Sequence, residues 1–458
     1  MAKTPTKELP RLNVVVSEKR KRSGGRIHCV IGEQIQFDEN RLLSYCFAEW
    51  KPVVFDMLVV AAAVEFCDRL QRRPVIGWSR DIHLEIPVHD KELWESQSVK
   101  AALLAALSFL TGDKWNVMFV ARKKEEISRT QPSLSLPSGA HAIVPFSDGM
   151  DSRAVAALSA QRLNSALIRV RLGSKRHDQP MMDGRAQPFT NIPYKVKSSE
   201  RRFAESSNRS RGFKFSMIAG IAAYVADVKT IIIPESGQGA LGPPLVPVVQ
   251  AYPDYRNHPR FTERMEKLFA ALLNHNVSYT FPRLWFTKGE TLKEFVTETS
   301  VGGEWQETIS CWQQNRHVPV DGHRRQCGIC AACMLRRLSV HAAGLTEPSD
   351  QYVWENLSAS NFEDGAAEGF SKITPALREY AIAGTMHLDH LAGLADSPRF
   401  ESTIRRNAAE IAKAMNLTNE DAEMKLTSLL LRHRDEWQAF VESLGPDSFI
   451  RQWTVNVS

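Results

Sequence analysis

The sequence lacks any apolar run long enough to cross a membrane. The longest run, from Met57 to Val64, has eight residues and lies between Asp56 and Glu65, whereas a membrane-spanning helix needs about 20 apolar residues. The first residues, Met-Ala-Lys-Thr-Pro-Thr-Lys, also lack the apolar core of a secretory signal. We therefore expect a cytoplasmic protein with no membrane partner.

Cysteine is scarce as well, with seven among 458 residues. This number is typical of a reducing compartment, where clustered thiols indicate a metal site more often than a disulfide. The net charge of +6 is small for this length, so the sequence permits a nucleic-acid partner without requiring one. Hydrophobic residues make up 43% and charged residues 24%, which is an ordinary globular balance.

The N-terminal part of the chain divides in two. Residues 1–25 are polar, include the basic run 19–22, and are predicted to form a disordered basic arm. Residues 26–135 are predicted to form an N-terminal α/β domain, and Pro87 suggests that one of its strands lies at a sheet edge. The predicted elements are helices over 54–70 and 99–110 and strands over 82–88 and 115–120.

Strands and helices alternate strictly in residues 136–345. This alternation predicts a doubly wound parallel sheet of the α/β class, in which ligands bind at the carboxyl ends of the strands. The predicted elements are strands over 142–146, 165–170 and 229–233 and helices over 152–163 and 213–226. Residues 346–458 are predicted to be a helical C-terminal region, with helices over 405–415 and 421–431, whose default role is packing or partner binding.

The loop after the first of these strands reads Ser-Asp-Gly-Met-Asp-Ser at 147–152. A loop between a strand and a helix presents free backbone amides to phosphate. Gly149 allows a close approach of the phosphate, and the Ser147 and Ser152 hydroxyls add donors. Asp151 is the candidate for orienting the loop or holding Mg²⁺. The alternative is a polar strand-to-helix turn with an Asp or Ser cap.

Four cysteines form a second motif. Cys327, Cys330 and Cys333 are spaced Cys-x2-Cys-x2-Cys, and Cys311 precedes them. Four close thiolates are typical of a tetrahedral, structural zinc site. The alternative is an iron–sulfur cluster, although the additional cysteine followed by proline that ferredoxins carry is missing here.

The loop at 147–152 resembles the Ser-Gly-Gly-x-Asp-Ser signature of PP-loop ATP pyrophosphatases. That resemblance implies cleavage of ATP between the α- and β-phosphates and adenylation of a substrate. Asp148 departs from the family pattern, because it stands where the family usually has glycine. A carboxylate beside a phosphate cradle is unfavourable unless it points away or binds the metal.

More of the chain resembles one branch, the 7-cyano-7-deazaguanine synthases, or QueC family. Gly-Ser-Lys-Arg-His at 173–177 resembles the family's Gly-Gln-Arg-His, and Arg-Ser-Arg-Gly-Phe at 209–213 opens a helix where the family has a phosphate-contacting arginine. Tyr-Pro-Asp-Tyr-Arg at 252–256 resembles the family's Tyr-Pro-Asp-Cys-Arg at its base-binding pocket. Lys288 resembles a lysine just before the family's own cysteine knot.

The QueC resemblance implies a fold of the PP-loop, adenine nucleotide alpha hydrolase type, with ATP, Mg²⁺ and Zn²⁺ as cofactors. The catalytic residues that it implies are Asp151, Ser152 and Lys288. The ATP-binding residues that it implies are Ser147, Asp148, Gly149, Met150, Asp151, Ser152, Arg176, Arg209 and Arg211. The substrate-binding residues are Tyr252, Asp254 and Arg256, to which their position after the third strand adds Glu235 and Gln238. The alternatives are a simple turn at 235–239 and a turn-capping role for Asp254.

The implied substrate is a 7-deazaguanine-type carboxylate, adenylated and then transferred to an amine. The resemblance covers roughly residues 140–342, and the extra length resembles QueC-like proteins of bacterial anti-phage operons, such as QatC-type proteins of the Qat system and those of CBASS systems. There the acceptor would be a protein amine instead of ammonia. A PP-loop tRNA-modifying enzyme and a non-catalytic nucleotide-binding module are the alternative functions.

Overall fold

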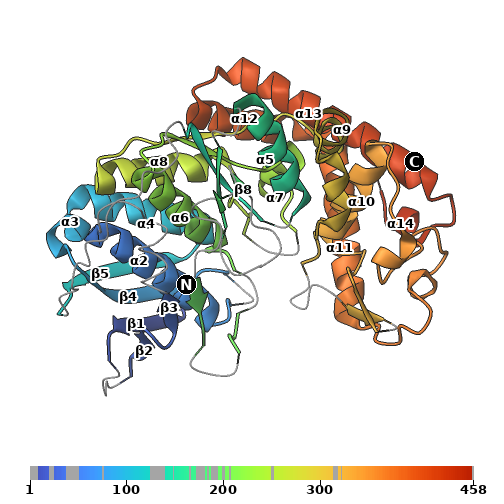
Figure 1. The fold of residues 1–458 in the computed structure, drawn as a ribbon. Coiled ribbons are helices and arrows are strands. Elements are labelled where there is room, and N and C mark those ends of the chain that lie inside the picture. The colour runs from blue at the N-terminus through green and yellow to red at the C-terminus, as the bar shows by residue number, and fades with distance from the viewer. Residues whose placement is uncertain are drawn as a thin grey trace, which may run out of the picture.

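Two parallel sheets and a group of C-terminal helices make up the fold (Figure 1). The structure is a computed structural model. The residues that it describes are 9–19, 25–37, 51–74, 77–123, 140–147, 149–163, 167–171, 181–182, 185–186, 194–198, 202–205, 208–248, 252–312, 318–320 and 322–455. Within these ranges, no helix is long and apolar enough to cross a membrane.

The N-terminal sheet has the strand order β2-β1-β4-β5, with every pair parallel. Its strands are β1 (Arg11–Ser17), β2 (Ile27–Val30), β4 (Asp81–Val88) and β5 (Lys114–Ala121). Strand β1 corrects the predicted disordered arm, because residues 11–17 lie inside the sheet. Leu12, Val14 and Val16 alternate along it and are buried, which is the period-2 pattern of a half-buried strand.

Pro87 is not on an edge strand, as the sequence had suggested. Strand β4 lies between β1 and β5, but its pairing with β1 ends at Glu85. The proline therefore lies beyond the last residue of that ladder, where its missing amide removes none of the bonds to β1. The strands over 82–88 and 115–120 themselves are confirmed.

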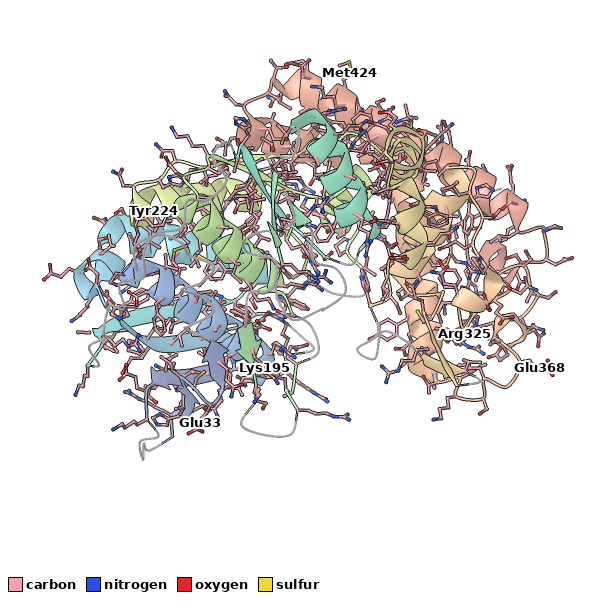
Figure 2. All side chains as sticks on the ribbon, viewed as in Figure 1. Glu33, Lys195, Tyr224, Arg325, Glu368 and Met424 are labelled. Carbon is pink, nitrogen blue, oxygen red and sulfur yellow. The ribbon has the colours of Figure 1, made fainter. Side chains whose placement is uncertain are left out.

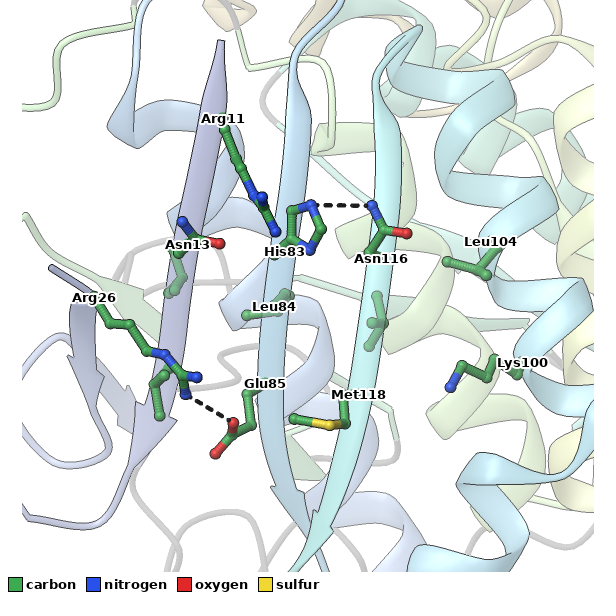
Figure 3. Close-up of a pocket in the computed structure, with 13 residues that line it drawn as sticks. Arg11, Asn13, Arg26, His83, Leu84, Glu85, Lys100, Leu104, Asn116 and Met118 are labelled. Atoms are coloured by element: carbon green, nitrogen blue, oxygen red, sulfur yellow. Dashed lines mark hydrogen bonds and ion pairs between the residues drawn. The ribbon is translucent and has the colours of Figure 1, made fainter. Parts of the chain in front are cut away.

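One face of the N-terminal sheet is polar and hollowed (Figure 3). A cavity of about 440 Å³ is lined there by β1, β4 and β5 and by Lys100 and Leu104 of the neighbouring helix. The Asn116 side-chain NH₂ group donates to His83 Nε2 at 3.4 Å, and Arg26 pairs with Glu85 at 3.4 Å. None of the predicted site residues lines this cavity.

The second sheet has the order β12-β11-β6-β7, again with every pair parallel. Its strands are β6 (Ala142–Pro145), β7 (Leu167–Val170), β11 (Thr230–Ile232) and β12 (Ser278–Thr280). Helix α5 (Met150–Leu163) covers one face, with α9 (Lys288–Glu298) packed on it, and α6 (Arg211–Val225) and α8 (Pro259–Leu273) cover the other. The predicted doubly wound sheet is confirmed. Its strand order reverses between β6 and β11, where such sheets bind ligands.

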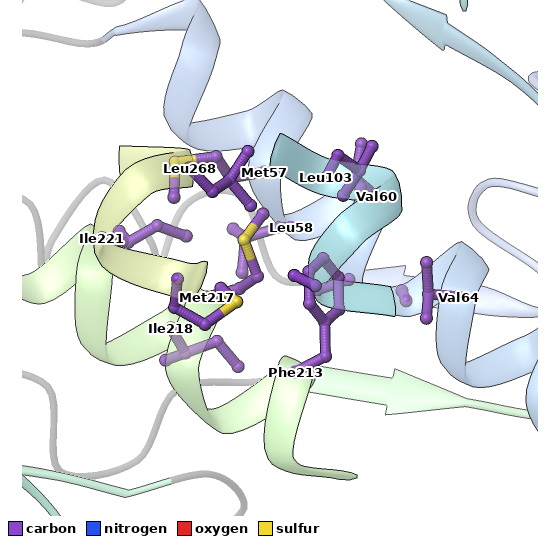
Figure 4. Packing of buried hydrophobic residues seen from close by; sticks show 14 of the residues in the cluster. Met57, Leu58, Val60, Val64, Leu103, Phe213, Met217, Ile218, Ile221 and Leu268 are labelled. Atoms are coloured by element: carbon purple, nitrogen blue, oxygen red, sulfur yellow. The ribbon is translucent and has the colours of Figure 1, made fainter. Parts of the chain in front are cut away.

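A layer of four helices joins the two sheets. Helices α2 (Pro52–Leu70) and α4 (Gln97–Thr111) pack on α6 and α8. Met57, Val60, Leu103, Met217 and Leu268 meet in this layer, and each is 0% exposed (Figure 4). Each such buried apolar side chain stabilises the fold by roughly 1.5–3 kcal/mol. The N-terminal part and the second sheet therefore share one core.

The C-terminal region is helical, as predicted. Its helices are α11 (Pro375–Asp396), α12 (Glu401–Met415), α13 (Asn419–Ser443) and α14 (Phe449–Gln452), and α10 (Ala331–Ala342), which precedes the region, packs on α11 and α13. The Thr418 side chain accepts a hydrogen bond from the Asp421 amide and so caps α13. Figure 1 shows α13 running over the second sheet toward α10 and α11.

Shorter elements complete the described chain. They are α3 (Lys91–Glu95), α7 (Gly237–Leu245), four 3-10 helices (Gly302–Glu307, Ser349–Gln351, Glu363–Gly365, Pro398–Phe400), and the antiparallel pairs β3 (Ile35–Phe37) with β10 (Tyr194–Val196), β8 (Met181–Met182) with β9 (Arg185–Ala186), and β13 (Val318–Val320) with β14 (His323–Arg325).

Candidate active site

The predicted phosphate loop lies directly after β6, at the carboxyl edge of the second sheet. The Ser147 and Ser152 hydroxyl oxygens are 2.9 Å apart, and the Gly149 amide donates to Ser147 Oγ at 3.2 Å. Met150 begins α5 and is buried. The loop therefore leads into the N-terminus of a 14-residue helix, which favours anions. Asp148 lies outside the described residues.

Lys288 and Asp151 form a buried ion pair. Lys288 is the first residue of α9, Asp151 lies in the first turn of α5, and each is 8% exposed. Thr287 fixes the start of α9, because it forms a capping box with Glu290. The Asp151 carboxylate is buried, and a side-chain hydrogen bond links it to Glu235 as well. The chain thus holds an ammonium group and two neighbouring carboxyl groups beside the phosphate loop.

Glu235 adds a second carboxyl group to this position. It follows β11 and accepts a hydrogen bond from Asn257 at 2.8 Å. Burial, and then the neighbouring charge of Asp151, raise the pKa of Glu235 to about 8. A Cβ on Gly239 would lie 2.1 Å from Glu235 Oε1, so only glycine leaves room for this carboxyl group. Two carboxyls, one of them protonated near neutral pH, therefore face a single lysine.

Gln238 was predicted to contact the substrate, but its side chain bonds to other residues of the protein. Its Oε1 accepts from the Lys288 amide at 2.7 Å, and its Nε2 lies 2.8 Å from His433 Nδ1 and 3.3 Å from Glu436. The side chain is only 3% exposed. These bonds direct it toward α9 and α13. A substrate contact by Gln238 stays a prediction that this bonding does not favour.

The two predicted triphosphate arginines lie at the start of α6. Arg209 donates to the Tyr252 carbonyl at 2.8 Å and lies 3.5 Å from Asp254. Burial lowers the pKa of Arg209 despite the nearby Asp254. Arg211 places its guanidinium over the Phe215 ring. Arg176 lies outside the described residues, so its contact with the triphosphate stays a prediction.

The predicted base-binding segment at 252–256 forms hydrogen bonds with the end of α4 and with Arg209 before α6. The Tyr252 hydroxyl donates to the Phe109 carbonyl of α4 at 2.6 Å. Asp254 accepts from the Arg256 Nε at 2.8 Å and from the Arg256 amide at 3.1 Å. Burial alone would raise the pKa of Asp254, but Arg256 and Arg209 outweigh it and hold that pKa below its usual value. The hydrogen bond from the Arg256 backbone amide to Asp254 is the turn-capping contact that was named as the alternative role for Asp254.

The N-terminal part supplies residues that the sequence did not identify. Trp78 stacks on Tyr252 at 6.3 Å between ring centroids, and the Arg209 guanidinium lies 5.1 Å from the Trp78 centroid. Asp68, fully buried, accepts from the Ser210 amide at 2.7 Å. These contacts join segments more than 100 positions apart, so no local pattern could have revealed them.

The four predicted zinc ligands come together. The sulfur atoms of Cys311, Cys327, Cys330 and Cys333 all lie within 4.8 Å of one another and are buried. The Cys327 and Cys333 sulfurs are 3.8 Å apart, the separation expected for two thiolates about 2.3 Å from one tetrahedral ion. In a [4Fe–4S] cluster each thiolate binds a different iron, and in a [2Fe–2S] cluster the four thiolates are divided between two irons, so sulfurs on different irons lie further apart. The donor set fits one zinc ion.

The fold around the cysteines is tight. Gly328 has a φ of +83°, which favours glycine in the Cys-x2-Cys turn. Helix α11 lies directly on this turn: a Cβ on Gly384 would lie 2.8 Å from the Ala331 amide nitrogen and 3.0 Å from the Ile329 oxygen. The four-cysteine cluster, called the cysteine knot below, therefore joins the second sheet to the C-terminal helices.

Residues 211–344 match the family model described as queuosine biosynthesis protein QueC. The chain carries a QueC-like region. It is 26% identical over 178 residues to a 7-cyano-7-deazaguanine synthase of Psychrobacter sp. (strain PRwf-1), covering 38% of this chain and 61% of that protein. Proteins of the same name from Hydrogenovibrio crunogenus and Thiobacillus denitrificans are 30% and 32% identical over 103 residues, 21% of this chain and 40% and 41% of theirs.

The chain thus spans between 40% and 61% of the length of these relatives. The QueC match begins at the first residue of α6 and includes the 252–256 segment, Lys288 and the four cysteines. It does not include the phosphate loop or α13. The structure itself confirms the predicted α/β fold with a four-cysteine cluster and a helical C-terminal region, and the match over residues 211–344 supports its PP-loop type.

Proposed function

We propose that this protein is an ATP-dependent ligase that adenylates a 7-deazaguanine carboxylate and transfers the acyl group to an amine. The observation that carries the proposal is the meeting of Lys288, Asp151 and Glu235 at the carboxyl ends of β6 and β11. The similarity to 7-cyano-7-deazaguanine synthases supports the substrate class, and the resemblance at 147–152 supports ATP.

In this proposal the start of α5 holds the phosphates of ATP. The Gly149 amide and the hydroxyls of Ser147 and Ser152 donate to phosphate oxygens. Lys288 then stabilises the charge that develops as the bond between the α- and β-phosphates breaks. Arg209 and Arg211 lie at a second helix N-terminus and neutralise the rest of the triphosphate.

Asp151 is the proposed Mg²⁺ ligand. It lies in the first turn of α5, directly after the phosphate loop, and a hard cation suits a carboxylate oxygen beside phosphates. When bound, Mg²⁺ would offset phosphate charge. Glu235, whose pKa is raised, can hold its proton beside Asp151 without adding a second negative charge.

The proposed chemistry has two steps. The substrate carboxylate oxygen attacks the α-phosphorus of ATP, and pyrophosphate leaves with the bonding electron pair. An amine nitrogen then attacks the acyl carbon, AMP leaves, and the amine proton passes to a base. Tyr252, Asp254 and Arg256 are the proposed contacts to the deazaguanine ring, with Trp78 stacked behind Tyr252.

The acceptor is proposed to be an external amine, either ammonia or an amine of a partner protein, because the sequence carries no glutaminase motif. We also propose a role in anti-phage defence, which is supported by the resemblance in length and general pattern and by no motif. Phage plating on cells that carry the wild-type or the Asp151→Ala protein tests this role: equal plating would remove it.

The proposed activity is tested by AMP release from ATP with 7-carboxy-7-deazaguanine, followed by mass spectrometry of the product. Wild type should release AMP in a substrate-dependent manner, and Asp151→Ala should not. AMP release that depends on RNA instead would favour the tRNA-modifying alternative. ATP binding without AMP release would favour the non-catalytic module.

A further inference from the structure

Helix α13 lies outside the QueC match, yet two of its residues reach the candidate active site. One side of the helix is exposed, as Met424 at 62% shows (Figure 2). The other side carries His433, which is fully buried, and Glu436. Both contact Gln238 at the start of α7, and Glu436 also accepts a hydrogen bond from Thr287 at the start of α9.

The bonds of His433 fix the orientation of the Gln238 amide. His433 Nε2 lies 2.9 Å from the Leu388 carbonyl, which only accepts, so Nε2 carries the ring hydrogen. Burial lowers the pKa of His433 to about 4, so the ring is neutral and Nδ1 is an acceptor. Gln238 must therefore turn its NH₂ group to His433, which leaves its oxygen facing the Lys288 amide at 2.7 Å.

Glu436 bonds two helix starts, that of α7 through Gln238 and that of α9 through Thr287. It accepts hydrogen bonds from the Gln238 NH₂ group and from the hydroxyl of Thr287, which is the residue that caps α9. A Cβ on Gly289 would lie 3.1 Å from Glu436 Oε1 and 2.7 Å from the Ala342 Cβ. The first turn of α9 is therefore seated closely against α13 and α10.

We propose that His433 and Glu436 are positioning residues that place Lys288 against Asp151, acting through Gln238 and Thr287. The assignment of a reaction to Lys288 rests on the proposed function, but the placement itself does not. In this assignment the C-terminal region completes the active site, which goes beyond the packing or partner-binding role expected from sequence. A displacement of a catalytic group by about 1 Å can lower a rate on the order of 100-fold.

The first experiment needs no ligand. Hydrogen exchange is measured by NMR at the Lys288 amide of the purified full chain. Gln238→Leu should raise that exchange rate on the order of tenfold or more, because the acceptor is lost. His433→Phe should raise it less, since the ring volume is kept but the Gln238 amide loses its orientation. Glu442→Gln, an exposed change on the same helix, should leave it unchanged.

Kinetics distinguish positioning from a merely structural role. Gln238→Leu and His433→Phe should lower kcat for AMP release on the order of tenfold, with little change in KM for ATP. The Gln238→Glu variant sets two carboxylates together and should lose activity. The Gln238→Glu, Glu436→Gln double variant relieves that repulsion and should be more active than Gln238→Glu alone, but it should stay below wild type because His433 Nδ1 still lacks a donor.

The outcomes separate this inference from the proposed function. A wild-type protein that binds ATP but releases no AMP would contradict the proposed function, whereas faster exchange at the Lys288 amide in the variants would still support the placement. Unchanged exchange at Lys288 in Gln238→Leu, or unchanged kcat in both single variants of an active enzyme, would overturn the positioning role. Failure of the double variant to recover more than the Gln238→Glu single variant would also count against it.

Discussion

Lys288, the first residue of α9, forms a buried ion pair with Asp151 in the first turn of α5. The two residues lie 137 positions apart. The pair joins the phosphate loop of one βα unit to the helix that precedes the cysteine knot. A buried pair of this kind is costly to break from one side, because the remaining charge stays buried. It is therefore a structural and a proposed catalytic feature at once.

Zinc removal should unfold the C-terminal half of the molecule. Purified protein is expected to contain about one zinc per chain by metal analysis, because four buried thiolates fit one ion. Cys330→Ser should lose both zinc and folded protein, since structural zinc contributes folding free energy directly. Cys67→Ala, which changes a buried cysteine outside the cluster, should keep the zinc. Well-folded protein without zinc would contradict this prediction.

Gly384→Ala should destabilise the protein by about 1–3 kcal/mol, measured by chemical denaturation. The added Cβ would lie 2.8 Å from the Ala331 backbone nitrogen, and α11 would have to move off the knot. Gly303→Ala is the control, because nothing lies within 4 Å of a Cβ there. Equal stability of the two variants would show that α11 does not press on the knot.

The stability of Glu436→Gln relative to wild type should depend on pH. Burial raises the pKa of Glu436 from 4.5 to about 7, although the Thr287 hydrogen bond opposes the shift. A carboxyl whose pKa is raised on folding stabilises most below pH 4.5 and loses that contribution as the pH rises through 7. The unfolding free energy of Glu436→Gln minus that of wild type should therefore rise by up to about 3 kcal/mol as the pH increases from 4.5 to 7.5.

Denaturation of wild type, Glu436→Gln and the exposed control Glu442→Gln at several pH values tests this sign. The difference between Glu436→Gln and wild type should grow with pH, and the difference for Glu442→Gln should stay constant. A pH-independent offset for Glu436→Gln would mean that Glu436 titrates normally in the folded protein.

Asp254→Asn decides between base binding and turn capping. If Asp254 receives the amidine edge of the deazaguanine, loss of its charge should abolish substrate-stimulated AMP release, because a buried carboxylate recognises that edge strongly. ATP affinity should be retained. Calorimetry of wild type and variant with 7-carboxy-7-deazaguanine and ATP provides the measurement. Equal affinities would leave the bonds to Arg256 and its amide as the full role of Asp254.

Local patterns predicted the second sheet and the zinc site. Alternating strands and helices determined the doubly wound architecture, and the spacing of Cys327, Cys330 and Cys333 brought three ligands together within one turn and a helix start. The loop at 147–152 was placed correctly at the carboxyl end of β6, because its strand and helix were both recognisable. Such features depend on neighbours in the sequence.

Long-range features were missed for the same reason. Gln238 has Glu436 and His433 as partners almost 200 positions away. Trp78 and Tyr252 meet at the end of α4, where each donates a hydrogen bond to a backbone carbonyl. Strand β1 was mistaken for part of a basic arm, since its short apolar run Val14–Val16 lies between polar and charged segments. Pro87 was read by its usual preference for edge strands, which the short ladder between β1 and β4 overrides.

ATP–pyrophosphate exchange tests the central claim most directly. Wild type should catalyse exchange only when ATP and 7-carboxy-7-deazaguanine are both present. Lys288→Met should lower the exchange rate by about 100-fold or more, while Lys293→Met, an exposed change on the same helix, should retain it. Folded, zinc-containing wild type that shows no exchange, or a Lys288→Met variant as active as Lys293→Met, would contradict the account.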